Sequence, residues 1–355
     1  MQIPVLDSRK RPLMPTNSVR ARLLLKMGRA KAYWNKLGIF CIILQKEVEP
    51  DNQKIVVGID PGSKFEGWSV VGTKQTILNG ESEAPWWVKD AVEVRANMRG
   101  ARRFKLWNRA GKQNKTPRNR TKSKIPPSTY ARWNAKLRIL VQLQKILPIT
   151  DVAVEDIKAR TLKATKQKPN RRYNSNFSPL EVGKSWFYNQ IKESGLTLHL
   201  KQGYETKALR DCYNLKKVSN KAEKSFNAHT VDAWVLAASV SGALKPTWLG
   251  LFYWVPIRLH RRQLHAFQPS KGNIRRPYGG TRSMGLSRGT LVKHIKYGLT
   301  YIGGTLKERV SLHSIATGKR LTQNAKPSDL EILTTTHWRS QLIPILKGGV
   351  SVAQK

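Results

Sequence analysis

Seven residues decide the fold: GIDPGSK, Gly58–Lys64, directly after the apolar run Ile55–Val57. The apolar run predicts a buried strand, and the Pro-Gly pair that follows predicts a turn. Asp60 is therefore expected at the end of a rigid strand, just before the chain turns away. A carboxylate in that position can bind a metal ion in a fixed geometry.

Two later acidic positions extend this idea. Glu155 closes the apolar run Val152–Val154, which predicts a central strand. Asp232 ends the segment NAHTVD, in which Asn227 is able to cap a helix that reaches about Ser239. Three separated carboxylates brought together on one sheet are what a magnesium-dependent nuclease of the ribonuclease H type requires.

The expected metal ligands are Asp60, Glu155 and Asp232. We expect Asp60 to bridge two Mg²⁺ ions, with Mn²⁺ able to substitute, and the other two carboxylates each to complete one ion. His229 lies three residues before Asp232, so the two share a helical face. Taken alone, His229 is better explained as a surface or capping histidine. Beside these carboxylates we prefer a catalytic role, in which it accepts the proton of the attacking water.

The charge balance indicates a polyanionic partner. The 355 residues include 65 Lys and Arg against 22 Asp and Glu, a net charge of +43. Nucleic acid is the first candidate and an anionic membrane surface the second. Eleven Trp and ten Tyr favour nucleic acid, because aromatic faces stack on bases. Similar Asp-Gly turns occur in sugar kinases and actin-like ATPases. Those enzymes need further Gly-rich phosphate loops, and no convincing loop of this kind is found. They also have no use for a net charge of +43.

Several features favour the cytoplasm over a membrane. Cys41 and Cys212 form no CxxC motif and are expected to be free thiols in a reducing compartment. No signal peptide is visible, and the longest apolar stretch, Trp234–Leu244, is too short to span a bilayer. We therefore expect a cytoplasmic protein.

The first 85 residues predict a small basic module followed by a meander. A helix is expected over Val19–Trp34 and a strand over Ile39–Leu44. An antiparallel meander should follow, with strands at Ile55–Asp60, Gly67–Gly72 and Thr76–Leu78.

Residues 86–125 change to an almost purely cationic composition. Arg95, Arg99, Arg102 and Arg103 share one face of a predicted helix. A solvated charged face is the simpler alternative, but the planar guanidinium fork suits phosphates, so we favour phosphate binding. Lys112–Lys124 is expected to become ordered only on a ligand. The expected nucleic-acid-binding residues are Arg20, Arg22, Arg95, Arg99, Arg102, Arg103 and Arg109.

After residue 127 the pattern predicts alternating helices and strands, and from residue 246 it predicts mainly strands. Helices are expected from Ser128 to about Leu147 and, with Ser178 as the cap, to about Ser194. A basic loop (158–176) should precede the second helix, and a strand (196–201) should follow it. Residues 246–355 predict a separate, basic and mostly β unit.

Taken together, these motifs resemble the three split RuvC motifs of transposon-encoded RNA-guided nucleases. The segments are Gly58–Lys64, Val154–Asp156 and Ala228–Asp232. The N-terminal segments RPLMP, RARLL and GRA look like the PLMP domain of the IscB and IsrB group, and the Arg-rich stretch looks like its bridge helix. YGGT at 278–281 and RGTLVK at 288–293 are also similar to that group.

The spacing of these motifs points to one subfamily. Only residues 156–228 lie between Glu155 and His229, and they contain the single histidine His199. An HNH domain, which IscB carries there, needs at least a pair of histidines. The chain therefore resembles IsrB, the form without HNH. This implies an omega-RNA-guided endonuclease that nicks the non-target, displaced strand of double-stranded DNA beside a short adjacent motif.

The resemblance also implies an architecture. The fold class is α/β, a split RuvC/ribonuclease H-like domain with an Arg-rich bridge helix. The expected layout is a PLMP domain (1–50), RuvC part I (51–85), bridge helix and basic linker (86–127), RuvC parts II and III (128–245) and a C-terminal module for RNA and the adjacent motif (246–355). The protein is expected to be a monomer within a ribonucleoprotein. Two alternatives stay open: a RuvC-like resolvase without guide RNA, and a non-catalytic basic RNA-binding protein.

Overall fold

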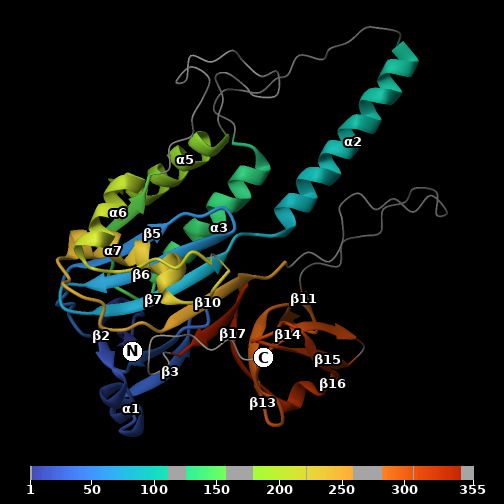
Figure 1. Ribbon diagram of the computed structural model, residues 1–355. Helices are drawn as coiled ribbons and strands as arrows, with labels where there is room; N and C mark the ends of the chain where they lie inside the picture. Colours follow the sequence, from blue (N-terminus) through green and yellow to red (C-terminus); the bar gives the residue numbers. More distant parts are fainter. Residues whose placement is uncertain are drawn as a thin grey trace.

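A seven-stranded mixed sheet forms the centre of the molecule (Figure 1). The computed structural model describes residues 2–110, 125–156, 179–220, 222–258, 282–306 and 308–344. In spatial order the strands are β18 (Trp338–Ile343), β10 (Leu251–Pro256), β7 (Thr76–Glu83), β6 (Phe65–Gly72), β5 (Ile55–Asp60), β8 (Asp151–Glu155) and β9 (Thr197–Lys201). The predicted meander is confirmed, because β5, β6 and β7 pair antiparallel. The chain is thus a mixed α/β protein.

Helices cover both faces of this sheet, so all six residues of β5 are buried. Ile55, Val57 and Ile59 pack in the core formed with α3 (Pro127–Gln144) and α5 (Pro179–Glu193). Val56 and its neighbours on the opposite face pack against α7 (Val231–Ser241). Since strand residues alternate between faces, Asp60 belongs to the α7 side.

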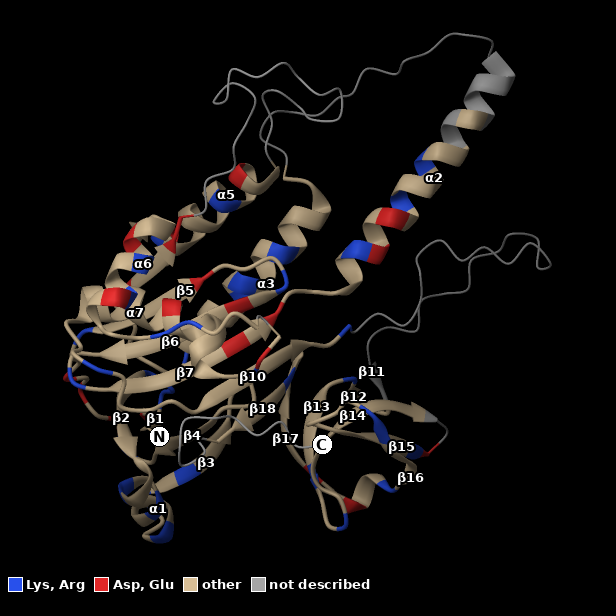
Figure 2. Cartoon of the chain, viewed as in Figure 1, with Lys and Arg blue, Asp and Glu red and all other residues tan. Residues whose placement is uncertain are grey.

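Helix α2 (Trp87–Ala110) projects away from the sheet (Figure 1). Its 24 residues correspond to a length of about 36 Å. Figure 2 shows Lys and Arg on α1, and both basic and acidic residues on α2. Lys112–Lys124 and the predicted loop at 158–176 lie outside the described residues, as do Ser178 and the YGGT segment.

The N-terminal module is a four-stranded sheet with one short helix. Its strands are β1 (Gln2–Leu6), β2 (Pro12–Asn17), β3 (Ala30–Trp34) and β4 (Phe40–Leu44), and its helix is α1 (Ser18–Lys26). The predicted helix over Val19–Trp34 is therefore wrong in its second half. Gly28 adopts φ +66°, which ends the helix, and Ala30–Trp34 pairs with β4 instead.

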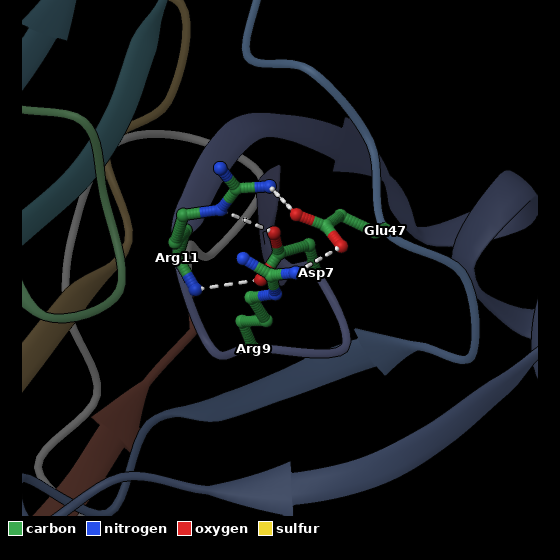
Figure 3. Close-up of polar contacts among 4 residues, drawn as sticks. All are labelled: Asp7, Arg9, Arg11 and Glu47. Atoms are coloured by element: carbon green, nitrogen blue, oxygen red, sulfur yellow. Dashed lines mark hydrogen bonds and ion pairs between the residues drawn. The ribbon is translucent and has the colours of Figure 1, made fainter.

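Charged side chains stabilise the turn between β1 and β2 (Figure 3). Asp7 accepts hydrogen bonds from the backbone N–H of Arg11 at 2.7 Å and from its Nε at 2.6 Å. Glu47 pairs with both Arg9 and Arg11 at 2.9 Å. Burial by itself would raise the pKa of Asp7, but the hydrogen bonds from Arg11 outweigh it and lower that pKa. These two arginines are thus partly neutralised within the module.

The C-terminal residues that the structure describes contribute strands to three sheets, one of which is the central sheet. A five-stranded sheet contains β16 (Arg320–Ala325), β15 (Arg309–Ser314), β14 (Gly298–Leu306), β13 (Thr290–His294) and β17 (Leu330–Thr335). A short hairpin of β11 (Arg282–Ser283) and β12 (Leu286–Ser287) precedes it. The expected boundary at residue 246 does not separate the sheets, because β10 pairs with β7 and β18 pairs with β10.

Two predicted helix starts also differ from the structure. Helix α3 begins at Pro127 with Pro126 at the cap position, so Ser128 lies inside the helix. The last helix begins with a π-helical turn, Phe226–Thr230, which places Asn227 within the turn instead of at its cap. In the described part of the chain, no helix combines the length and the apolar composition that a membrane span needs.

Candidate functional site

The ends of two parallel strands bring Asp60 and Glu155 together. Strands β5 and β8 are neighbours, and Ile59 is level with Val154. The next residue on each strand is therefore Asp60 or Glu155, and both face α7. Asp60 is 7% exposed.

Helix α7 supplies the third carboxylate because two glycines let it approach the sheet. A Cβ atom on Gly58 would lie 1.8 Å from the carbonyl oxygen of Ala233, and one on Gly67 would lie 2.1 Å from that of His229. Residues with side chains at these positions would push the helix outward. The close approach places Asp232, in the first turn of α7, above the ends of β5 and β8.

Two hydrogen bonds tie the start of α7 to the sheet. The hydroxyl of Thr230 donates to the carbonyl of Gly80 at 3.0 Å, and the indole N–H of Trp234 donates to the hydroxyl of Thr76 at 2.9 Å. All four residues are largely shielded from water or lie within buried strands. These contacts fix the position of the first turn of α7, and so of Asp232, relative to the strands of the sheet.

Two cations neutralise the carboxylates. Arg210 on α6 (Gly203–Cys212) donates from Nη1 to Oδ1 of Asp232 at 2.5 Å. The ammonium of Lys217 donates to Oδ2 of Asp232 and lies 3.5 Å from Oδ2 of Asp60. Burial would lower the pKa of Lys217, but the carboxylates of Asp60, Asp232 and Glu155 outweigh it and raise that pKa. Lys217 is thus held charged between its acidic neighbours.

Glu155 occupies the third corner of this cluster. Burial first, and then the nearby carboxylates of Asp60 and Asp232, raise its pKa, while Lys217 opposes the change. Oε1 of Glu155 also lies 3.0 Å from the position that a Cβ atom would take on Gly203. The three predicted metal ligands therefore interact electrostatically in one site that α6 borders.

A separate polar network holds the strand end that carries Glu155. The next residue, Asp156, receives hydrogen bonds from the hydroxyl of Tyr188 and from Nε2 of Gln202, both at 3.1 Å. Nζ of Lys184 lies 2.8 Å from Asp156. Burial would raise the pKa of Asp156, but these partners lower it. Asp156 is thus a structural anchor between β8, α5 and α6.

His229 lies in the π-helical turn and is 8% exposed. Its ring packs against Phe65, with ring centroids 5.5 Å apart, and its carbonyl lies over Gly67. Gly67 pairs with Asp60 across β5 and β6. His229 is therefore a buried residue on the same side of the sheet as the carboxylates, and its proton-accepting role stays a prediction.

The carboxylate oxygens of Asp60, Glu155 and Asp232 are suitable ligands for a divalent cation, although the distances between these side chains are not those of a metal site. Carboxylate oxygens are the ligands that Mg²⁺ prefers. The positive charge of Lys217 between Asp60 and Asp232 shows that the site accepts a cation. Within the described ranges, however, no three His, Cys, Asp or Glu side chains stand at metal-binding spacing. A metal ion held by Asp60, Glu155 and Asp232 would compete with the ammonium group of Lys217 for oxygens of Asp60 and Asp232.

The expected nucleic-acid-binding arginines lie on two helices. Arg20 and Arg22 are exposed on α1, where the side chain of Asn17 accepts a hydrogen bond from the backbone N–H of Arg20 at 2.8 Å. Arg99 is exposed on α2, whereas Nε of Arg95 donates to the carbonyl of Ala91 at 2.9 Å. Arg102, Arg103 and Arg109 belong to α2, but their side chains lie outside the described residues.

Sequence reasoning missed Arg210, Lys217 and a fourth acid, Glu81. Glu81 lies in one cross-strand row with Asp60, because Gly67 pairs with both residues. It is completely buried, and neither carboxylate oxygen has a hydrogen-bond partner. Burial, opposed by Lys224, raises its pKa to about 8. Alternation along GESE indicates that Glu81 shares a face with Glu83, but no sequence signal shows that this face is covered.

Comparison with known proteins gives a match to one family model over part of the chain and weak likenesses to solved structures, among them two of RuvC. The family model described as RRXRR protein, a family found in IscB- and IsrB-like proteins, matches residues 3–174, a little less than half of the chain. No curated protein matches the sequence. RuvC of T. thermophilus in complex with a Holliday junction substrate is 14% identical, with a TM-score of 0.28, over 55% of this chain and 99% of that chain. A second Thermus thermophilus RuvC structure is also 14% identical, with a TM-score of 0.27, over 54% of this chain and 99% of that chain.

Proposed function

We propose that this chain is a metal-dependent nuclease and, more specifically, an omega-RNA-guided endonuclease that nicks the non-target strand of DNA. The convergence of Asp60, Glu155 and Asp232 carries the proposal. A protein with a net charge of +43 brings together two carboxylates at the ends of adjacent strands and a third from the first turn of α7. Such a cluster is costly to bury unless cations neutralise it.

The chemistry assigned to the site is phosphodiester hydrolysis. Divalent cations, when bound, supply charge neutralisation and activation of water. Asp60, Glu155 and Asp232 would hold them through carboxylate oxygens, as the composition of the cluster allows. His229 would accept the proton of the attacking water, because an imidazole nitrogen can act as a general base. Arg210 would hold the carboxylate of Asp232 in place through the contact at 2.5 Å.

The RNA-guided part of the proposal rests on charge and on motif resemblance. Exposed Arg20, Arg22 and Arg99 lie on two helices outside the carboxylate cluster, so they are available to phosphates at a distance from the cut. The match of residues 3–174 to the RRXRR family and the PLMP-like segments support the same assignment. Base pairing between the guide RNA and the target DNA would then recognise the target sequence, while the protein binds the sugar–phosphate backbone.

The experiment compares the protein with a variant that lacks one ligand. The chain is expressed with its flanking genomic DNA, purified, and any bound RNA is sequenced. A supercoiled plasmid that matches the guide portion is then incubated with Mg²⁺. Asp60→Asn should lose nicking and keep RNA and DNA binding, whereas Asp51→Asn, an exposed acid in the linker before β5, should behave as the wild-type protein.

Each outcome separates the candidate functions. A defined RNA together with an open-circular product that Asp60→Asn cannot form supports the guided nickase. Cleavage of branched DNA without a specific RNA would replace it with a resolvase. Binding without any metal-dependent cleavage would leave a non-catalytic RNA-binding protein.

A further inference from the structure

Tyr204 is the most exposed aromatic residue in the part of the chain that the structure describes, at 76%. It is the second residue of α6. Other exposed aromatic rings, such as Trp86 and Tyr130, pack against a neighbouring ring. A single exposed ring is not unusual in itself, so the significance of Tyr204 depends on where the fold places it.

The fold places Tyr204 at the border of the carboxylate cluster. Its neighbour Gly203 has backbone so close to Glu155 that an added Cβ atom would lie 3.0 Å from Oε1. Consecutive Cα atoms are about 3.8 Å apart. The Cα atom of Tyr204 therefore lies one residue step from the backbone that contacts a proposed metal ligand, and its ring is open to solvent.

The position of Tyr204 is rigidly held. Gln202 donates from Nε2 to Asp156 at 3.1 Å, and the backbone N–H of Asp156 donates to the carbonyl of Lys201 at 2.7 Å. Gln202 and Glu205 also form a capping box at the start of α6. The start of the helix thus moves together with the strand end that carries Glu155.

Positive side chains accompany the ring. Lys207 lies three residues after Tyr204, on the same helical face, and is exposed. Lys216 is exposed on the loop that also delivers Lys217. An aromatic face with cations next to it is the combination that binds single-stranded nucleic acid, because the ring stacks on a base and the cations bind phosphates. The net charge of +43 favours a nucleic acid over a protein as the partner of this ring.

We propose that Tyr204 stacks on an unpaired nucleobase next to the bond presented to Asp60, Glu155 and Asp232. This inference rests on the proposed nuclease function and deepens it. Stacking on Tyr204 would hold the strand in single-stranded form at the border of the site and align one phosphate with the carboxylates. The site would accordingly favour unpaired over fully paired substrate, and the ring, not the hydroxyl, would be the essential group.

The test uses the purified protein with its bound RNA and the inactive Asp60→Asn background. The displaced strand of the target carries the fluorescent base 2-aminopurine at successive positions. In the protein with Tyr204 we expect the 2-aminopurine fluorescence to be quenched at one or two adjacent positions. The quenching should persist in Tyr204→Phe and Tyr204→Trp. Tyr204→Ala should abolish the quenching and weaken strand binding about 5- to 150-fold, the range measured for loss of one stacked base.

Matched controls and a second readout keep the test decisive. Leu244→Ala removes another exposed apolar side chain, 87% exposed and beyond the far end of α7, and should change neither signal. Cross-linking at 254 nm followed by mass spectrometry shows whether Tyr204 carries a thymidine or a uridine adduct, which distinguishes DNA from RNA as the source of the base. The proposal would be overturned if Tyr204→Ala left strand affinity and 2-aminopurine fluorescence unchanged and if the wild-type protein formed no adduct at Tyr204.

Failure of this inference is distinguishable from failure of the nuclease function. If quenching at Tyr204 is observed but the wild-type protein never cleaves, the stacking site stands and the nuclease function falls. If the protein cleaves but Tyr204→Ala binds and cuts like the wild type, only the stacking site falls. The melting temperature of Tyr204→Ala should equal that of the wild type, since the ring makes little contact with the core.

Discussion

The ammonium group of Lys217 lies 3.5 Å from Oδ2 of Asp60 and also binds Asp232. An internal cation therefore neutralises two of the three carboxylates that would bind a divalent metal. Such a lysine stabilises the metal-free protein, because it prevents repulsion among buried carboxylates. It also competes with a metal ion for the same oxygens. The site thus couples protein stability to metal binding.

Replacing Lys217 should separate these two effects. Lys217→Met should lower the free energy of unfolding by about 1.5–3 kcal/mol without metal, the usual value of a hydrogen bond to a charged group. The same change should strengthen Mn²⁺ binding, because the competing ammonium is gone. Calorimetric titration with Mn²⁺ and thermal melts with and without Mg²⁺ measure both quantities. Lys216→Met removes the adjacent exposed lysine as a control, and equal Mn²⁺ affinity in all three proteins would contradict the competition.

The approach of α7 to the sheet predicts an intolerant glycine. Gly58→Ala would place a Cβ atom 1.8 Å from the carbonyl of Ala233. The helix must then move outward, which should lower the free energy of unfolding by about 1–3 kcal/mol or more and carry Asp232 away from Asp60. Gly72→Ala is the matched control on the neighbouring strand, where the nearest atom would be 3.7 Å away. Equal chemical denaturation midpoints for the two variants would show that α7 does not lie this close.

Glu81 predicts a specific pH dependence of stability. Glutamate in an unfolded chain titrates near 4.3, whereas burial raises the pKa of Glu81 to about 8 in the folded protein. Between these values the folded protein keeps a proton that the unfolded chain releases. The free energy of unfolding should therefore fall as the pH rises from about 4 to about 8.

Glu81→Gln should remove the part of this loss that Glu81 contributes, because the amide has nearly the same shape and no titratable proton. Each pKa unit corresponds to about 1.4 kcal/mol, so the variant should be more stable than the wild type at pH 8 and similar to it near pH 4. Urea denaturation at several pH values measures the difference. Glu49→Gln, which changes an exposed acid, should leave the profile unchanged. A wild-type profile in Glu81→Gln would mean that Glu81 ionises normally.

The opposite face of the sheet contains a buried ion pair that predicts a non-additive pair of variants. Nζ of Lys136 on α3 lies 2.5 Å from Oε1 of Glu66, and both residues are buried. Ser82 donates to the other oxygen of Glu66 at 3.0 Å. Lys136→Met removes the cation that partners the buried Glu66 and leaves it only the hydrogen bond from Ser82, which should cost about 3–5 kcal/mol.

The double variant Glu66→Gln/Lys136→Met should recover much of that stability, because no isolated charge remains in the core. Chemical denaturation of the wild type, the two single variants and the double variant gives the coupling free energy. Costs that simply add would show that the two side chains do not interact in the folded protein.

Much of the site could be predicted from sequence because its signals are local. The apolar runs before Asp60 and Glu155 specify two buried strands, and Pro61 and Gly62 specify where the first one ends. These patterns depend on neighbours within a few residues. Helix boundaries were less accurate where pairing partners decide the conformation, as for Ala30–Trp34, which forms a strand by pairing with β4.

What the sequence by itself determined is the set of acidic strand ends and the excess of positive charge. Only the tertiary structure decided that β10 and β18 complete the central sheet, that Lys217 and Arg210 bind the carboxylates, and that Glu81 is sealed from water. The physical reason is that a strand pattern encodes which face is apolar but not which strand becomes its neighbour. Neutralising cations and covered acids arise from contacts between residues that are distant along the chain, and folding alone brings those residues together.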